Sequence, residues 1–154
     1  MGKIIKGELI AHDLRFALCV SRFNSFLTER LLEGAIDCLL RHGAKEDSFD
    51  TYWTPGSFEL PYVAAKLLEK SRYDAVICLG AVVRGDTPHF DFIAAEVTKG
   101  IASLSLKSGV PVIYGVITVD TLEQGIERAG TTAGNKGWDA ALSAIEMSNL
   151  YRAL

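Results

Sequence analysis

The segment RGDTPHF at residues 84–90 carries the side chains of this chain that are best suited to chemistry. It follows a strongly apolar run at 74–83, so it is predicted to form the turn between a buried strand and the next helix. Thr87 is a favoured N-cap residue and Pro88 suits the first helical position, so a helix is predicted to start at Thr87. Its free N–H groups would lie beside Gly85, where the backbone can approach a ligand closely. The turn therefore predicts a site for an anion the size of a phosphate.

His89 adds proton-transfer chemistry to this turn. An imidazole beside a bound anion can exchange protons near neutral pH, which makes His89 a candidate general acid or base. Two structural interpretations stay open, because water fills most helix N-termini and a histidine at this place can cap the helix. A third, cell adhesion through the tripeptide Arg84, Gly85 and Asp86, is disfavoured because such tripeptides act from exposed loops of secreted proteins.

Length and composition indicate one domain, residues 1–154, that has a small-molecule partner. Hydrophobic residues make up 49% of the chain, and counting the 14 glycines while leaving out the 5 tyrosines raises this to roughly 55%, above the usual ~45–50%. This excess of apolar residues predicts an oligomer. The net charge of −3 comes from 16 basic and 19 acidic residues without long runs of either sign, which argues against nucleic acid and membrane surfaces as partners.

The cysteines predict a reducing compartment, taken here as the cytoplasm. Cys19, Cys38 and Cys78 are odd in number, lack C-x-x-C spacing and lie in apolar patterns, where a free thiol behaves as a small hydrophobe. The three histidines show no paired ligand spacing, so no metal is expected. Neither an apolar stretch of about 18 residues nor a signal peptide is found, so a soluble, unprocessed protein is expected.

Apolar runs of strand length alternate with segments of helical period, the pattern of βα units and a parallel sheet. Strands are predicted at 15–21, 49–54, 74–83 and 110–118, with an additional N-terminal strand at 3–10. The first helix is predicted to have Ser25 as N-cap and Gly43 as the residue after its end. Further helices are predicted at 57–70, 91–106, 120–128 and 138–151. Asp120 and Glu123 resemble a capping box at the start of the fourth.

Ligands of an open parallel sheet bind beyond the carboxyl ends of its strands, and three polar or aromatic segments of this chain are predicted to meet there. They are residues 21–24, residues 54–59 and the turn at 84–90. Phe23 at the first strand end either fills the core or presents its ring to a flat heterocycle. Ser57 and Glu59 at a helix start are explained by default through helix capping and the helix dipole, and ligand contact is the alternative.

Five motifs together resemble the lumazine synthase family over nearly the whole chain. They are SRFN at 21–24, PGSFELP at 55–61, RGDTPHFDFI at 84–93, GVIT at 115–118 and EQGIERAGTTAGNKG at 123–137. The resemblance implies a transferase of riboflavin biosynthesis. It would condense 5-amino-6-(D-ribitylamino)uracil with 3,4-dihydroxy-2-butanone 4-phosphate to 6,7-dimethyl-8-ribityllumazine, without cofactor or metal. It also implies a three-layer α/β/α, flavodoxin-like fold with a four-stranded parallel sheet and an N-terminal strand that joins a neighbouring subunit.

The resemblance also implies roles for individual residues. His89 would move protons as the catalytic residue, and Asn24 is a further candidate contact. The butanone phosphate would be bound by Gly85, Asp86, Thr87 and Arg128. The ribitylaminouracil would be bound by Phe23, Ser57, Phe58, Glu59, Ala81, Val82, Val83 and Tyr114.

Each site would lie between subunits of a pentamer, which in this family also builds sixty-subunit icosahedral capsids and can work with riboflavin synthase. A neighbour would contribute Tyr114, Arg128 and, as a further candidate, Lys136. Without the resemblance, Arg128 is better explained as a cation at a helix C-terminus, and Tyr114 has a parallel explanation as a core aromatic residue of a strand.

Three positions depart from the family pattern. A carboxylate at Asp86 would repel phosphate, so its side chain is expected to point away from it. Tyr114 stands where phenylalanine would also serve, and Thr132 where the family often carries lysine. A flavodoxin-like electron-transfer module and a purely structural shell protein stay open as alternatives; the first would retain a bound flavin.

Overall fold

The computed structural model describes residues 2–130 and 134–154, which form a central sheet of four parallel strands. The strands run in the order β2-β1-β3-β4 and comprise β1 (Phe16–Ser21), β2 (Phe49–Thr54), β3 (Ala75–Val83) and β4 (Val112–Val119). All pairings are parallel, and the register pairs Phe16 of β1 with Phe49 of β2 and Ala75 of β3. The four predicted main strands are confirmed, with ends that agree within two residues.

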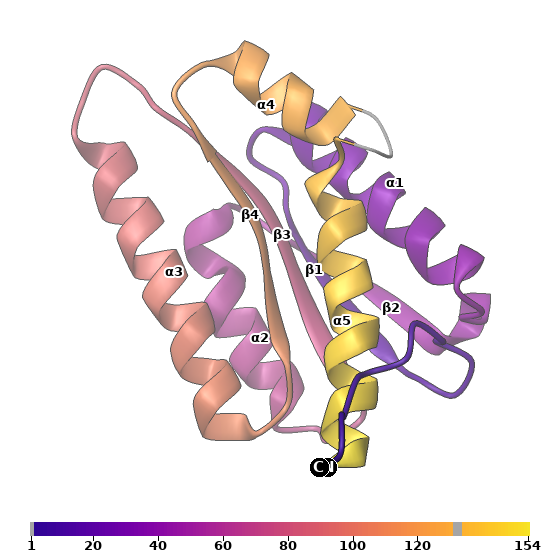
Figure 1. The fold of residues 1–154 in the computed structure, drawn as a ribbon. Helices are drawn as coiled ribbons and strands as arrows, with labels where there is room; N and C mark the ends of the chain where they lie inside the picture. The colour runs from indigo at the N-terminus through magenta and orange to yellow at the C-terminus, as the bar shows by residue number, and fades with distance from the viewer. Residues whose placement is uncertain (1, 131–133) are drawn as a thin grey trace.

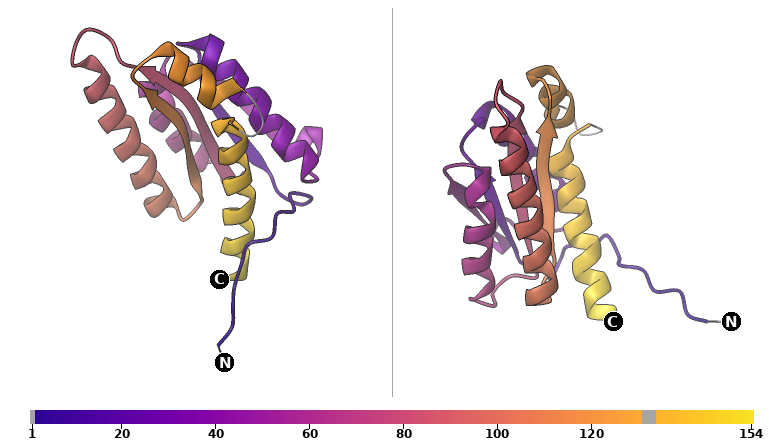
Figure 2. Two further views of the ribbon diagram at one scale, coloured as in Figure 1. Left: turned by 45° about the horizontal axis from the view of Figure 1, so that its top comes forward. Right: turned by 90° about the vertical axis from the view of Figure 1, so that its left-hand side faces the viewer.

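Five α-helices within the described residues cover the two faces of this sheet. Helices α2 (Leu60–Leu68) and α3 (His89–Ser108) lie on one face, while α1 (Ser25–Arg41) and α5 (Lys136–Ala153) lie on the other (Figure 1). Helix α4 (Leu122–Gly130) lies at the carboxyl ends of the strands, on the side of α1 and α5 (Figure 2). The predicted three-layer α/β/α architecture is therefore confirmed.

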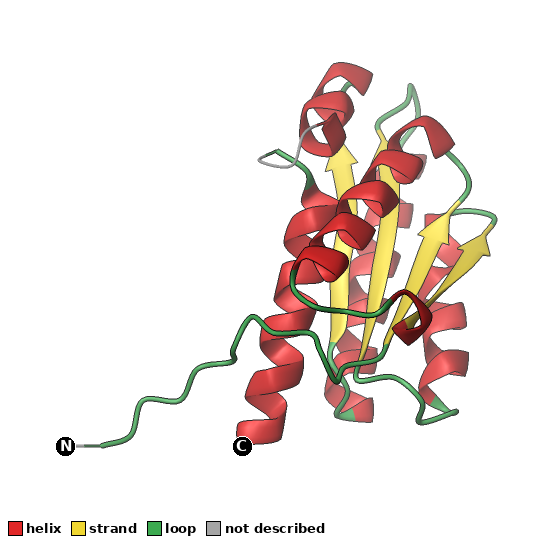
Figure 3. Ribbon diagram, turned by 90° about the vertical axis from the view of Figure 1, so that its right-hand side faces the viewer, coloured by secondary structure: helices red, strands yellow, loops and turns green. Residues whose placement is uncertain are grey.

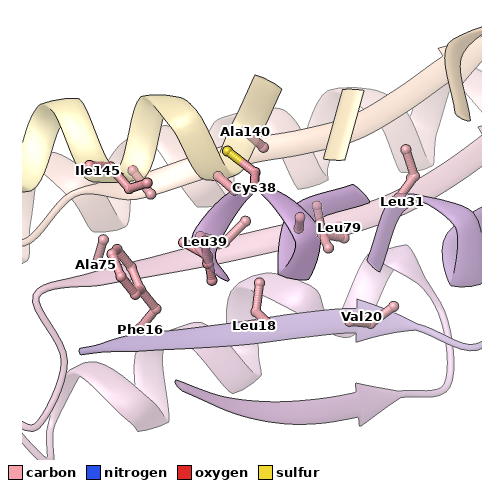
Figure 4. Packing of buried hydrophobic residues seen from close by; sticks show 14 of the residues in the cluster. Phe16, Leu18, Val20, Leu31, Cys38, Leu39, Ala75, Leu79, Ala140 and Ile145 are labelled. Carbon is pink, nitrogen blue, oxygen red and sulfur yellow. The ribbon is translucent and has the colours of Figure 1, made fainter. Parts of the chain in front are cut away.

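The two central strands are buried on both faces, and alternate residues fill two separate cores. Phe16, Leu18 and Val20 of β1 face α1 and α5 and pack with Leu39 and Ile145 (Figure 4). The residues between them, Ala17 and Cys19, belong to the second core under α2 and α3. This two-sided burial is typical of parallel sheets and explains why the sequence shows continuous apolar runs.

The starts of two helices differ from the prediction by one residue. Asn24, rather than Ser25, is the N-cap of α1, and its φ of 64° is left-handed, a conformation that asparagine tolerates better than serine. The N-cap of α3 is Pro88 rather than Thr87, and the Thr87 hydroxyl accepts a hydrogen bond from the His89 N–H over 3.4 Å. The predicted role of Gly43 after α1 is confirmed by its φ of 99°.

Two other predicted boundaries are also shifted. The capping interactions of α4 involve Thr121 and Gln124 rather than Asp120 and Glu123: the Gln124 N–H donates to Thr121 Oγ1, and the Asp120 N–H to Gln124 Oε1. The segment predicted as a helix from Ser57 begins with a 3-10 turn, Ser57–Glu59, before α2.

Residues 2–10 extend away from the domain and form no strand within the single chain (Figure 3). The predicted N-terminal strand is therefore not part of this chain's own sheet. The end of the segment is held against α5, where Asn149 Nδ2 donates to the carbonyls of Glu8 and Ile10 over 2.6 and 2.9 Å. That the segment joins a neighbouring subunit stays a prediction. In the described part of the chain, no helix has the length and apolarity that crossing a membrane requires.

Candidate active site

A pocket of about 440 Å³ opens at the carboxyl ends of the central strands, beside the start of α3. Three segments far apart in the sequence meet there: the β1–α1 turn, the β2–α2 connection and the β3–α3 turn. This is the meeting point that the rule for parallel sheets predicts. The pocket is lined by Phe23, Asn24, Gly56, Ser57, Phe58, Ala81, Val82, Val83, Gly85, Thr87, His89, Phe90 and Ile93.

The β1–α1 turn is fixed by hydrogen bonds that present the ring of Phe23 to the pocket. The Phe23 N–H donates to the Pro55 carbonyl over 2.9 Å, and Asn24 Nδ2 donates to the Ala81 carbonyl over 3.1 Å. Phe23 keeps 71% of its surface exposed, so its ring is available to a ligand rather than buried in the core. The core interpretation of Phe23 is therefore wrong.

Ser57 is buried where the β2–α2 connection crosses the end of the sheet. Its hydroxyl donates to Ser21 Oγ over 3.4 Å, and a Cβ on Gly80 would lie only 2.6 Å from Ser57 Oγ. Glycine at position 80 therefore makes room for this serine. The next residue, Phe58, exposes about half of its surface and supplies a second ring to the pocket.

The β3–α3 turn is the segment for which an anion site is predicted. Gly85, Thr87 and His89 all line the pocket, and His89 is solvent-exposed at the first residue of α3. The first N–H groups of a helix lack intrahelical partners and give this end a partial positive charge. That an anion binds at this turn beside the imidazole stays a prediction.

The pocket has aromatic walls but almost no formal charge. Phe90, which sequence reasoning missed, adds a third ring to those of Phe23 and Phe58. His89 is the one histidine among the residues that line the pocket, and neither lysine nor arginine contributes to this lining. Such a site suits a flat heterocycle, but its lining residues offer a doubly charged phosphate no fixed cation.

Of the contacts predicted from the three segments at this edge, Glu59 and Asp86 do not line the pocket. Asp86 is exposed on the turn. Conversely, Phe90 and Ile93 line the pocket without having been predicted to bind substrate. Ile93 stands four residues after His89, on the same face of α3, so helical spacing counted from His89 could have identified it.

The remaining predicted residues lie in a second pocket, of about 340 Å³, between β4, α4 and α5. Tyr114, Arg128 and Lys136 all line it, and the two pockets have no lining residue in common. Tyr114 is 41% exposed and its hydroxyl accepts a hydrogen bond from Thr98 Oγ1 over 3.0 Å, so it is not a core residue. Within one chain, Arg128 and Lys136 are thus separated from the aromatic pocket.

The cations of this second pocket have only partial partners. Arg128 Nη1 donates to the Gln124 carbonyl over 3.3 Å, and Lys136 Nζ lies 3.7 Å from Asp139 Oδ2. Both contacts leave donors on the guanidinium and the ammonium that can reach a ligand. Thr132, where the family pattern differs, lies outside the described residues.

The described residues contain no group of three or more histidine, cysteine, aspartate or glutamate side chains that could hold a metal ion. All three cysteines are free and buried in the two cores. The hydrogen bond with Cys19, together with burial, raises the pKa of Cys78 well above its ordinary value, so this thiol stays protonated. The described cysteines therefore act as core residues.

One comparison with known protein families bears on this geometry. The family model described as 6,7-dimethyl-8-ribityllumazine synthase matches residues 13–152. The match includes every strand, every helix as far as Arg152, and the linings of both pockets.

Proposed function

We propose, from the premise that the chain belongs to the 6,7-dimethyl-8-ribityllumazine synthase family, that it condenses 5-amino-6-(D-ribitylamino)uracil with 3,4-dihydroxy-2-butanone 4-phosphate. The products are 6,7-dimethyl-8-ribityllumazine, phosphate and water, in the penultimate step of riboflavin biosynthesis. The observation that carries the proposal is the composition of the first pocket, which joins aromatic rings, a helix N-terminus and one histidine.

The heterocycle is assigned to the part of the pocket that has aromatic and apolar walls. The ring of Phe23 stacks on the uracil, because its face is exposed and its backbone is held by Pro55. Ser57 and Phe58 contact the polar edge of the uracil and the ribityl chain, together with Glu59. The apolar ends of β3 line the rest of the pocket through Ala81, Val82 and Val83.

The phosphate of the second substrate is assigned to the β3–α3 turn, where Gly85 and Thr87 line the pocket and the backbone of Asp86 lies between them. The carboxylate of Asp86 points away, in agreement with its absence from the lining. This placement brings the ketone of the butanone near His89, so that the amine of the uracil can attack it.

His89 moves protons through the reaction. Attack of the 5-amino nitrogen on the ketone carbonyl releases water and forms a Schiff base. Removal of a proton from the adjacent carbon and loss of phosphate from the terminal carbon then give an enol, which tautomerises to a ketone. The ribitylamino nitrogen attacks this ketone and closes the ring with release of a second water. Each step transfers a proton to or from nitrogen, oxygen or carbon, which an exposed imidazole can do near neutral pH. The amine and the ketone are reactive already, so alignment supplies much of the acceleration.

The countercharge for phosphate comes from a second copy of the chain. Since neither lysine nor arginine lines the first pocket, while Arg128 and Lys136 line the second, the site is complete where the two pockets of neighbouring subunits meet. Arg128 pairs with the phosphate through its planar fork, and Tyr114 adds a ring beside the heterocycle. We assign a pentamer with five such sites, either alone or as the unit of a sixty-subunit capsid, in the cytoplasm, with riboflavin synthase as a candidate partner.

The test is to mix the purified protein with both substrates and follow the absorbance of the lumazine against the slow uncatalysed reaction. Acceleration by the assembled protein supports the proposal. Sedimentation velocity on the same sample distinguishes a pentamer from a sixty-subunit particle. An intact oligomer that gives no acceleration contradicts the proposal, and a flavin that stays bound through purification would favour an electron-transfer module.

A further inference from the structure

Asn135 joins three helices through one buried side chain. It is the N-cap of α5, where its Oδ1 accepts a hydrogen bond from the Trp138 N–H over 2.9 Å. Its Nδ2 donates to the carbonyl of Arg30 on α1 over 2.9 Å and to the carbonyl of Ala129 on α4 over 3.2 Å. Only 4% of Asn135 is exposed. Both donors of this amide are therefore used, each on a different helix.

Helices α1 and α5 approach each other closely beside the amide. A Cβ on Gly34 of α1 would lie 2.3 Å from Asn135 Oδ1, and a Cβ on Gly137 of α5 would lie 1.9 Å from the Leu31 carbonyl oxygen. Two glycines thus allow α1 and α5 to approach closely around Asn135. A buried amide that loses its hydrogen-bond partners destabilises the folded protein. The side chain of Asn135 therefore resists displacement from its three partners.

The tether acts on the backbone beside two cations. The Ala129 carbonyl belongs to the residue after Arg128, and Lys136 directly follows Asn135. Both cations line the second pocket, where they face the same space and repel each other. Arg128 and Lys136 can bind one anion together only if the backbone that carries them is rigid. The hydrogen bond from Asn135 to α4 and its N-cap on α5 provide this rigidity.

We propose that Asn135 is a positioning residue that sets the placement of Arg128 and Lys136 and thereby the affinity of the second pocket for phosphate. The inference rests on the proposed function, in which these cations meet the phosphate of a substrate bound by the neighbouring subunit. Asn135 lines neither the first nor the second pocket, so it is not assigned a contact with the substrate. It lines a separate pocket of about 280 Å³ together with its neighbours Arg30 and Ala129.

The substitution Asn135→Asp separates the tether from the helix cap. Aspartate still accepts the hydrogen bond from Trp138, but it presents an acceptor to the carbonyls of Arg30 and Ala129, which also accept. We expect weaker binding of inorganic phosphate to the assembled protein, measured by calorimetry, and a KM for the butanone phosphate that rises about tenfold. The kcat and the KM for the ribitylaminouracil should stay within about twofold of the parent values, a split that a general loss of stability does not produce.

Asn149→Asp is the matched control, because Asn149 Nδ2 also donates to two backbone carbonyls, at the far end of α5. We expect this variant to bind phosphate as the parent does. If Asn135→Asp does not assemble, Asn135→Ser keeps a capping hydroxyl without the reach of the amide, and the same weaker phosphate binding is expected. Phosphate affinity that is unchanged by the position-135 variants, or is equally weakened in Asn149→Asp, overturns the proposal.

Calorimetry with inorganic phosphate needs no turnover, so the two proposals can fail separately. A parent protein that binds phosphate but forms no lumazine contradicts the proposed function and leaves the role of Asn135 to be decided by its variants. If the parent protein makes lumazine and Asn135→Asp binds phosphate as tightly as the parent does, only the positioning role is contradicted. A parent protein that neither binds phosphate nor makes lumazine overturns both.

Discussion

Arg84 and Asp120 tie the end of β3 to the end of β4: Arg84 Nε donates to Asp120 Oδ1 over 2.8 Å. This hydrogen bond raises the pKa of Arg84 above its ordinary value. The guanidinium also lies 4.4 Å from the ring centroid of Phe90, and its Nη1 is 3.6 Å from Asp91. Although Arg84 opens the predicted anion turn, it does not line the pocket, and its guanidinium contacts two carboxylates and the ring of Phe90.

Replacing Arg84 with methionine is expected to impair catalysis by loosening Phe90. Because exposed ion pairs and cation–π contacts are individually weak, kcat/KM should fall between about twofold and tenfold rather than collapse. Arg84→Lys should recover little, since an ammonium cannot bind Asp120 and cover the ring at once. Steady-state kinetics on the assembled variants measures this.

Arg41→Met is the control for Arg84, because Arg41 makes a similar exposed ion pair with Asp37 at 2.9 Å on α1 and lines neither pocket that carries the proposed site. Its kcat/KM should match that of the parent. Equal losses in both variants would show that surface charge in general, rather than support of Phe90, matters to the rate.

Replacing His89 with alanine is expected to slow turnover without abolishing it. The imidazole supplies proton transfer, which typically contributes about 10²- to 10⁴-fold, and we expect the low end because the bound reactants are already reactive. The loss should appear in kcat, with both KM values nearly unchanged. A KM for the butanone phosphate that rises sharply while kcat is kept would instead make His89 a binding residue.

Replacing Arg128 with methionine should produce the opposite pattern. The guanidinium is the planar donor of the second pocket, so the KM for the butanone phosphate is expected to rise by roughly tenfold to a hundredfold while kcat falls little. Mixing Arg128→Met with His89→Ala subunits before assembly gives a sharper measurement. Some sites then combine an intact imidazole with a neighbour's intact arginine, and activity above the sum of the separate variants is expected. Without such recovery, the two residues would serve the same subunit's site.

The sequence was sufficient to predict the parallel sheet, because β1 and β3 are buried on both faces and their apolar runs are continuous. It was also sufficient to bring Phe23, Ser57 and His89 to one edge, since the carboxyl ends of parallel strands share it. Helix starts were less predictable. Asn24 caps α1 in a left-handed conformation while its amide binds Ala81, a contact 57 residues away that no local pattern contains.

Two features of the site depend on packing that the residue pattern does not express. Phe90 packs against the core under α2 and α3 and is in contact with Arg84, whose hydrogen-bond partner Asp120 lies 36 residues after Arg84. The separation of Arg128 from the aromatic pocket depends on where α4 lies against β4 and α5. The helical period of the sequence predicted that Arg128 lies at the end of a helix. The residues around it could be identified only from the three-dimensional fold.

Cys38 should make stability depend on pH in the alkaline range. Burial against α5, with smaller contributions from Asp37 and Asp139, raises the pKa of its thiol from 9.0 to about 12. Above pH 9 the unfolded chain therefore binds fewer protons than the folded chain, so stability is full below pH 9 and falls as pH rises toward 12. One such group contributes a slope of at most about 1.4 kcal/mol per pH unit. Urea unfolding at pH 8 and pH 10 should show a smaller decline for Cys38→Ala than for the parent, and equal declines would contradict this assignment.

Gly137→Ala is expected to destabilise the protein by about 3 kcal/mol, the upper range for overpacking. The new Cβ would lie 1.9 Å from the Leu31 carbonyl oxygen, which is backbone and cannot rotate away, so α1 and α5 must separate. Gly130→Ala is the control, because among the described residues no atom comes within 4 Å of a Cβ there. Its helix should be unchanged or slightly more stable, since alanine has the higher helix propensity. Thermal unfolding of the two variants measures the difference, and a Gly137→Ala midpoint equal to that of Gly130→Ala would mean that α1 and α5 are not in tight contact at this point.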